Sequence, residues 1–185
     1  MSVLKKISNK FIYIYLFTGS TFLCAQKSTV SEYHVKAAFL FNFTHFVEWP
    51  ASSFTSANSP MVIGVLEGNP FNSYLEMTIK GEIVNGHPLQ IQYFKNIEDV
   101  KTCHILFINI SETNKVQEIL KEINNRNILT VSDSPDFLKQ GGMIRFFIRN
   151  NKIQLQINPN AAAASNLIIS SKLLRLAEIV DSNKK

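Results

Sequence analysis

Few side chains in this sequence could do chemistry, and the first to consider are Ser132 and Asp133. They directly follow a short apolar run, residues 128–131, and open α/β sheets bind ligands just beyond the carboxyl ends of their strands. No Gly-x-Ser-x-Gly elbow surrounds the serine, so a serine hydrolase would need a histidine base brought beside Ser132 by the fold. We therefore predict a strand-end cap or turn here rather than a catalytic serine.

Metal and cofactor sites are not predicted either. The histidines lack the close paired spacing of a helix-borne zinc site; they are His34, His45, His87 and His104. Gly68 stands alone after an apolar run, so the chain has neither a dinucleotide fingerprint nor a phosphate-binding loop. Convergence of histidines and carboxylates that are distant in the sequence stays open. From the residues alone we predict no catalytic residue, no cofactor and no metal ion.

The N-terminus has the order of a secretory signal peptide. Lysines precede the apolar stretch 11–17, and small and turn-forming residues lead to Ala25, after which we place cleavage. The apolar stretch is too short for a comfortable membrane span, which takes roughly 20 residues. In a lipoprotein Cys24 would instead be the acylated first residue, but a leucine stands where such signals normally have a small residue. We therefore predict a signal peptide at residues 1–25 and a periplasmic domain at residues 26–185, with lipid anchoring as the less favoured alternative.

Cleavage changes the charge and the cysteine content of the mature chain. The formal net charge falls from +5 to +2, because three lysines and no acidic residues are removed. A basic face for nucleic acid is not indicated, and no nucleic acid partner is predicted. Only Cys103 remains, so no internal disulfide can form, although such a bond would persist outside the cytoplasm. We expect Cys103 to be a small buried residue that enters a strand.

Apolar runs of strand length alternate with helical patterns through most of the mature chain. A first helix is expected at residues 31–48, where apolar residues lie nearly all round, so this helix needs cover on more than one face. Homodimerisation through it is therefore a hypothesis. Further helices are expected at residues 71–80 and 112–125, the second capped by Ser111, and strands at residues 61–66, 89–94, 105–110 and 128–131. Such alternation is typical of a sheet with parallel pairs covered by helices.

The last third of the chain has a different pattern. Residues 143–149 and 152–158 predict an antiparallel hairpin around the turn Asn150-Asn151, with one wet face. An apolar stripe predicts a closing helix over residues 159–180. The predicted fold is thus α/β: a mixed, mostly parallel β-sheet flanked by helices in three layers, with a C-terminal β-hairpin and a final helix.

Three segments together resemble a known family. They are residues 33–50 (YHVKAAFLFNFTHFVEWP), residues 103–108 (CHILFI), and the tail Ile157-Asn158 followed by residues 169–174 (ISSKLL). Two further segments, residues 129–133 and 141–144, fit the same pattern. The sequence is similar to the YfiR-type periplasmic repressors over nearly all of the mature chain.

The resemblance implies a non-enzymatic, exported and often dimeric regulator. The best-characterised members bind a membrane-anchored diguanylate cyclase through its periplasmic sensor part and hold it inactive. Members that respond to reducing conditions carry cysteine pairs, whereas here Gly64 and Val65 stand where a partner for Cys103 would be expected in the first strand. Control through an intramolecular disulfide is therefore not predicted for this chain.

The resemblance also suggests candidate contact residues. Lys36, Trp49, Asn158 and Lys172 match the family pattern, and Phe41 with its helix neighbours is our choice for dimer or partner contact. The structural alternatives are solvated lysines at the two basic positions, a core tryptophan, and a helix-capping asparagine.

Besides the hydrolase, two other classes of function remain as alternatives. One is a regulator that binds the periplasmic domain of a diguanylate cyclase or a sensor kinase. The other is a periplasmic protein that binds a small molecule and presents it to a membrane receptor. An apolar pocket with convergent polar groups would favour the second class, and an exposed apolar patch without a pocket would favour the first.

Overall fold

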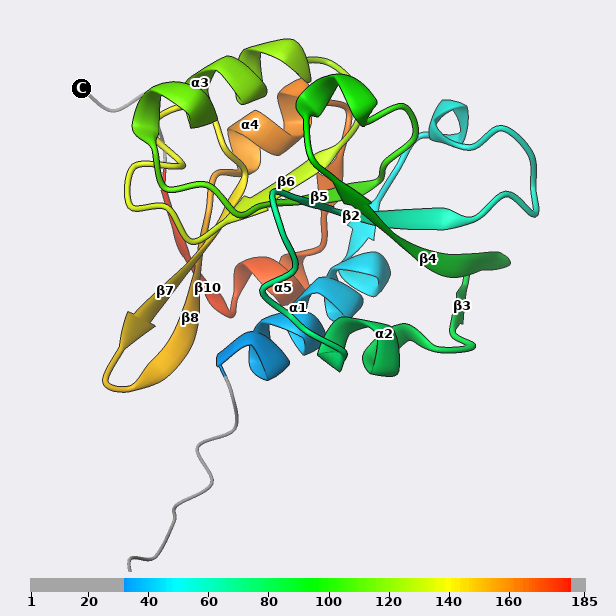
Figure 1. Ribbon diagram of the computed structural model, residues 1–185, viewed down its shortest axis with the longest axis horizontal. Coiled ribbons are helices and arrows are strands. Elements are labelled where there is room, and N and C mark those ends of the chain that lie inside the picture. The colour runs from blue at the N-terminus through cyan, green and yellow to red at the C-terminus, as the bar shows by residue number, and fades with distance from the viewer. Residues whose placement is uncertain (1–31, 181–185) are drawn as a thin grey trace, which may run out of the picture.

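The computed structural model describes residues 32–180, which form one mixed β-sheet between two layers of helices (Figure 1). The sheet order is β10-β8-β7-β6-β5-β2-β4-β3, and β1 and β9 form a separate two-stranded pair. The strands are β1 (Val47–Glu48), β2 (Met61–Leu66), β3 (Ile83–Val84), β4 (His87–Phe94), β5 (Ile105–Ile108), β6 (Leu129–Ser132), β7 (Ile144–Arg149), β8 (Lys152–Ile157), β9 (Ile168–Ile169) and β10 (Ala177–Ile179). The helices are α1 (Glu32–Phe46), α2 (Tyr74–Ile79), α3 (Thr113–Glu122), α4 (Pro159–Ala164) and α5 (Ser171–Leu174), with short 3-10 turns η1 (Ala51–Ser53) and η2 (Ile97–Asp99).

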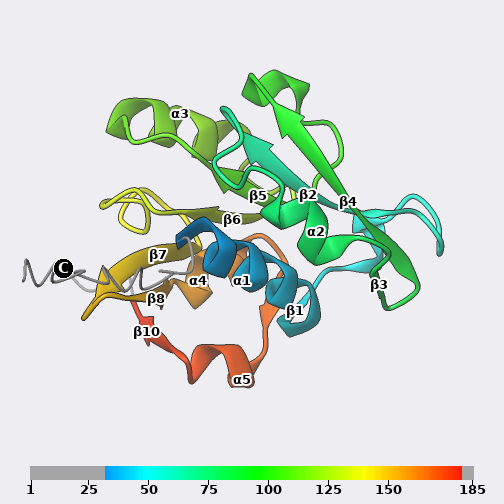
Figure 2. The same cartoon turned by 60° about the horizontal axis from the view of Figure 1, so that its bottom comes forward.

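The centre of the sheet confirms the predicted α/β class. All residues of β2, β5 and β6 are buried, and these strands pair in parallel, as expected of strands that are covered on both faces. The pairs β7–β8 and β3–β4 are antiparallel, and the first of them is the predicted hairpin. The order β4-β2-β5-β6-β7 is that of a doubly wound sheet, in which α1 and α2 cover one face and α3 covers the other (Figure 2).

Helix α1 supplies much of the core on its face of the sheet. Ala37, Leu40 and Phe43 are fully buried, and the ring of Phe43 stacks on that of Phe146 in β7 with centroids 6.1 Å apart. The helix ends at Phe46, where the chain becomes extended and Trp49-Pro50 follow. The expected helix therefore forms, slightly shorter than predicted. Contacts of Phe39 and Phe43 with Phe146 hold the helix on this face of the sheet.

The single closing helix that was expected over residues 159–180 is wrong. Helix α4 stops after Ala164, because Asn166 adopts the left-handed conformation (φ 56°) that asparagine tolerates better than most residues. The two isoleucines of β9 then pair with β1, and after the short α5 the strand β10 pairs in parallel with β8. Extension of the sheet thus outweighs the helical spacing of the apolar residues in this segment.

One predicted helix cap is also wrong. Helix α3 begins at Thr113 with Glu112 at its N-cap position, and no side chain caps it, so Ser111 does not play that role. By contrast, the side chain of Asn158 caps α4 as its amide oxygen accepts a hydrogen bond from the N–H of Ala161 (3.1 Å).

Candidate functional site

Ser132 is structural. Its hydroxyl donates to the carbonyl of Ile108 (2.8 Å) and accepts from the N–H of Ser134 (3.2 Å), and the side chain is fully buried. No histidine within residues 32–180 hydrogen-bonds to it. A buried serine whose hydroxyl ties two strand ends together cannot serve as the exposed nucleophile of a hydrolase. This arrangement counts against the hydrolase hypothesis.

Asp133, the next residue, pairs with Lys36 at the carboxyl end of β6. The ammonium of Lys36 lies 2.6 Å from Asp133 Oδ2 and 2.5 Å from Glu32 Oε1, and its side chain is only 1% exposed. It also lies 4.5 Å from the centre of the Tyr33 ring. The expectation of a solvated lysine is therefore wrong for this position. The pair joins the start of α1 to the end of a strand 97 residues later in the sequence.

The environment of Lys36 keeps it charged. Burial alone would lower the pKa of its ammonium, but the hydrogen bonds and negative charges of Asp133 and Glu32 outweigh burial and raise that pKa above its usual value. A cavity of about 400 Å³ adjoins the cluster and is also lined by Arg145. The Arg145 guanidinium is already bound, since it donates to Ser134 O and to the side chain of Gln156, both at 2.9 Å. The cluster of Lys36, Glu32 and Asp133 is therefore a charged joint, by which we mean that its ion pairs connect α1 to the end of β6. It is not a free anion-binding site.

Trp49 lies at the opposite edge of the sheet, within a cluster of aromatic rings. The Phe54 ring stacks on His87 (centroids 3.8 Å apart) on one side and on His104 (4.5 Å) on the other, and the Trp49 indole meets His104 edge-on. The indole N–H donates to the carbonyl of His104 at 3.1 Å. Trp49 is half-buried, so it is neither a pure core residue nor a surface residue.

His104 is held neutral in this cluster. Its Nδ1 accepts from the N–H of Val62 (3.0 Å), so Nε2 carries the proton and donates to the carbonyl of Ser53 (3.2 Å). Burial lowers the pKa of the imidazole to about 4, which outweighs the opposing effect of the Ser53 hydrogen bond. Because both ring nitrogens are hydrogen-bonded to the backbone, this neutral ring has a structural role and is not placed to act as an acid, a base or a metal ligand.

The rings of Trp49, Phe54 and His87 border a cavity of about 530 Å³. Its lining is formed by Val47, Glu48, Trp49, Ala51, Phe54, Ser56, Ala57, Met61, Asn85 and His87. The volume is in the range of small-molecule sites, and apolar walls with a few polar groups are their usual composition. Phe54 was missed at the level of the sequence, although an isolated aromatic residue in the polar linker 51–60 was a usable signal.

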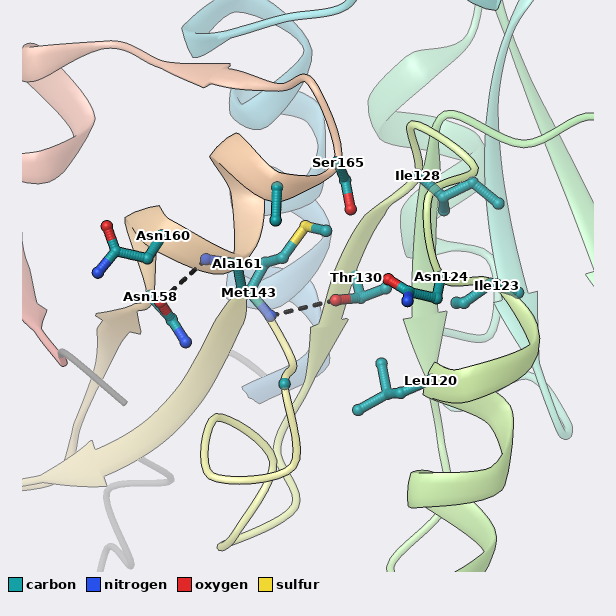
Figure 3. Close-up of a pocket in the computed structure, with 12 residues that line it drawn as sticks. Leu120, Ile123, Asn124, Ile128, Thr130, Met143, Asn158, Asn160, Ala161 and Ser165 are labelled. Atoms are coloured by element: carbon teal, nitrogen blue, oxygen red, sulfur yellow. Dashed lines mark hydrogen bonds between the residues drawn. The ribbon is translucent and has the colours of Figure 1, made fainter. Parts of the chain in front are cut away.

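Asn158 lies at the edge of another cavity, of about 350 Å³, between α3 and α4 (Figure 3). Thr130 and Met143 both line this cavity, and the N–H of Met143 donates to the hydroxyl of Thr130 (3.1 Å). Asn158 is 1% exposed, and its cap on α4 confirms the structural alternative for this residue. The predicted site residues thus do not come together. Lys36, Trp49 and Asn158 occupy three separate places in the fold.

The last two candidates, Phe41 and Lys172, lie on the neighbouring helices α1 and α5. Phe41 is half-buried on α1, where its ring packs edge-on against His45 (5.1 Å). Lys172 is exposed on α5, as expected of a solvated lysine. The two helices are tied together by the hydrogen bond from Ser170 N to Phe46 O (2.8 Å), directly before α5 and at the end of α1.

Cys103 is buried and unpaired, as predicted. Burial raises the pKa of its thiol to about 12, so the reactive thiolate is suppressed. A Cβ atom added to Gly64 would lie 2.8 Å from Cys103 Sγ. The two positions therefore face each other across β2 and the start of β5. Among the described residues no three His, Cys, Asp or Glu side chains gather as a metal site would require.

A family model described as YfiR/HmsC-like matches residues 33–178. The chain belongs to the YfiR/HmsC-like family. The match starts within α1 and ends within β10, so this YfiR/HmsC-like domain includes nearly every element described above and confirms the resemblance inferred from the sequence. A comparison with curated proteins found no match.

Membership narrows the class of function. YfiR-like proteins are periplasmic regulators that act on a membrane protein and are not known as enzymes, which supports a regulatory role for this chain. Within residues 32–180, no helix combines the length and the apolar composition that a bilayer span would need. The predicted signal peptide at residues 1–25, with the alternative lipid site Cys24, lies outside the described residues.

Proposed function

We propose that residues 26–185 form an exported repressor that binds the periplasmic part of a membrane-anchored signalling enzyme. The observation that carries the proposal is the YfiR/HmsC-like match over residues 33–178. The family favours a diguanylate cyclase as the partner, and a sensor kinase with a similar periplasmic part is the second possibility. The order of charged, apolar and small residues before Ala25 supports export.

Repression would work by differential binding. The regulator binds the inactive state of its partner more tightly than the active state, so its presence shifts the partner's population toward the inactive state. A stress or ligand that weakens binding then releases synthesis of cyclic-di-GMP, or kinase activity, on the cytoplasmic side. The size of this population shift is limited by the difference between the regulator's affinities for the active and the inactive state of its partner.

The contact surface that we propose combines the outer side of α1 with α5 and the turn that follows it. We name it the α1–α5 surface and define it by Phe41, His45, Lys172 and Leu176. Leu176 is 72% exposed, the highest value among the large apolar residues of the described chain. Phe41 and His45 present an aromatic pair, and Lys172 adds a cation. An apolar partner surface with a carboxylate opposite Lys172 would be complementary to it.

The test is retention of the partner by the purified regulator. Residues 26–185 would be immobilised and exposed to detergent-solubilised membrane proteins from the native cell, and retained proteins identified by mass spectrometry. We expect a protein with a periplasmic sensor and a cytoplasmic cyclase domain. A retained sensor kinase would replace the cyclase as the partner and leave the repressor mechanism intact.

Variants make the test specific to the surface. Leu176→Glu and Lys172→Glu should each lose the partner, whereas Lys121→Glu, an exposed change on α3, should retain it. Cellular cyclic-di-GMP should rise in the Leu176→Glu and Lys172→Glu variants and stay low in the control. Retention of neither kind of enzyme by the folded wild-type domain would contradict the proposal.

A second candidate function is supported by the aromatic cavity. Its volume and its lining favour a small, planar, partly apolar ligand that stacks on Trp49, with Phe54 in the wall beside it. Because Trp49 is the only tryptophan in the chain, its fluorescence reports on this cavity alone. Naphthalene sulfonate can serve as a probe: saturable quenching in the wild type that is lost in Phe54→Ala would support ligand binding. Equal, unsaturable quenching in both proteins would exclude it.

A further inference from the structure

The cavity between α3 and α4 differs in chemistry from the aromatic cavity. Its volume of about 350 Å³ is within the range of small-molecule sites. The described residues that line it include no charged side chain, no histidine and no aromatic ring. Its apolar walls come from α3 and the segment that follows it, and from the opposite side near α4: Leu120, Ile123, Ile128, Met143, Ala161 and Ala164. A charge placed between such walls would have no partner, so the cavity favours a neutral ligand with an apolar body.

Ser165, directly after α4, brings an unpaired polar group to this cavity. The residue is only 6% exposed and lines the cavity, but its hydroxyl has no hydrogen-bond partner among residues 32–180. Figure 3 shows this hydroxyl pointing into the space between α4 and Thr130. Buried hydroxyl groups are nearly always hydrogen-bonded, because an unpaired one has lost its water without a replacement. The hydroxyl of Ser165 therefore lacks a partner that a ligand in the cavity would supply.

Thr130 and Asn124 add two further groups to the same space. The hydroxyl of Thr130, which is 2% exposed, accepts from the N–H of Met143, and no described residue accepts its own proton. That proton is available to a ligand that has an acceptor. The side-chain amide of Asn124 also has no hydrogen-bond partner in the described chain, and it extends toward Thr130 from the other wall (Figure 3). Three polar groups thus converge from β6, from the end of α3 and from the end of α4.

We infer that this cavity binds a small neutral molecule that carries an amide group on an apolar chain. The carbonyl oxygen of the ligand accepts from the hydroxyl of Thr130 and from the amide nitrogen of Asn124. Its N–H donates to the hydroxyl oxygen of Ser165, and its chain lies against the apolar walls. A ligand without an acceptor would leave the proton of Thr130 unpaired. A carboxylate or an ammonium ion would be buried without an opposite charge among the described lining residues.

Three probes of equal chain length separate the charge of the head group from the shape of the ligand. They are pentanamide, pentanoate and pentylammonium, each titrated at neutral pH into the isotope-labelled mature chain, residues 26–185, and followed by two-dimensional NMR. We expect pentanamide to shift the backbone amide signals of Met143 and Ser165 in a saturable way. A probe this small should bind with a dissociation constant in the millimolar range. The two charged probes should bind at least about tenfold more weakly.

Ser165→Ala tests the unpaired hydroxyl. It should weaken the binding of pentanamide by roughly three- to tenfold, the effect of one hydrogen bond. Ser111→Ala is the matched control, because Ser111 is exposed and does not line the cavity. Because the hydroxyl of Ser165 has no partner within the described chain, Ser165→Ala should also leave the urea midpoint of the free protein unchanged or raise it. A purely structural serine would instead lower that midpoint.

A second pair of variants tests the position of the probe. Ala164→Phe fills the cavity from α4 and should abolish the shifts, whereas Ala163→Phe, at the exposed neighbouring position outside the lining, should preserve them. Equal affinities for the three probes would overturn the inference, because the cavity would then not select a neutral head group. It would also be overturned if no probe gave saturable shifts at Met143 and Ser165, or if Ala164→Phe bound pentanamide as tightly as the wild type. Shifts confined to the surroundings of Trp49 would assign the probe to the aromatic cavity and have the same consequence.

Discussion

The charged joint at Lys36 gives the most quantitative prediction, the effect of replacing this residue with methionine. Lys36→Met keeps the length and the apolar stem of the side chain and removes only the ammonium. The two carboxylate oxygens that it bridges, on Glu32 and Asp133, lie at most about 5 Å apart, at 2.5 and 2.6 Å from Nζ. Without the cation they repel each other across this distance.

The size of the loss follows from Coulomb's law. Two unit charges about 5 Å apart repel by roughly 3 kcal/mol at an effective dielectric constant of about 20, and by roughly 1 kcal/mol in water. Glu32 and Asp133 are 42% and 36% exposed, which places the repulsion between these limits. We expect Lys36→Met to lower the free energy of unfolding by about 2 kcal/mol.

Urea unfolding at neutral pH measures this loss, and Asp133→Asn provides the control. The double variant Lys36→Met, Asp133→Asn removes the repulsion and should recover most of the lost stability. Because the pKa of Lys36 is raised on folding, its contribution is complete below its unfolded pKa and lost as pH rises through the folded value. The difference between wild type and Lys36→Met should therefore be constant near neutral pH and shrink above about pH 10.5. A double variant no more stable than Lys36→Met would refute the reasoning.

Three further predictions concern residues away from this joint. Gly64→Ala should cost roughly 1–3 kcal/mol in urea unfolding, because its Cβ would meet Cys103 Sγ and the Phe94 ring, both at 2.8 Å, and Cys103→Ala should remove the part of this cost that comes from the sulfur. In an NMR titration, His104 should stay neutral down to about pH 4, so stability should fall as pH drops from about 6.5, where the unfolded imidazole takes up a proton. Asn158→Ala should lower the free energy of unfolding by about 1 kcal/mol, because the α4 cap is lost. Asn158→Ser should keep most of the stability, because serine can also cap a helix.

Each of these has an outcome that would contradict it. An equal cost of Gly64→Ala with and without Cys103 would show that the sulfur is not the obstacle. A titration midpoint of His104 near pH 6.5 would mean that the imidazole ring is in contact with water and not buried. Equal losses for the alanine and serine variants of Asn158 would assign its effect to another interaction.

The elements that were predicted correctly are those with strong local patterns. The strands β2 and β6 are continuous apolar runs, and the hairpin of β7 and β8 has an alternating pattern around Asn150-Asn151, so residues close in sequence already specify them. Helix α4 follows the same rule, since Asn158 and Pro159 mark its start. Beyond Ala164, however, the helical spacing was misleading, because the isoleucines of β9 are used for strand pairing with distant partners.

The candidate site depended on contacts that no local pattern contains. Lys36 and Asp133 were each noticed separately, but only the packing of α1 against β7 brings them together. Phe54 was placed in a linker by its polar neighbours, and its stacking between His87 and His104 needs three segments to meet. Sequence patterns report which residues are buried or turn-forming, whereas sites of this kind depend on long-range pairing.

The pairing of the C-terminal segment has a consequence for the secretion that we propose. The strand β9 closes onto β1, about 120 residues earlier in the chain, and β10 completes the sheet only beside β8. The end of α1 is therefore not fastened until almost the whole polypeptide has been synthesised. Contacts between such distant residues form slowly, because the long loop must close first. In the export that we propose, this late closure would keep the nascent chain unfolded while it passes through a translocon.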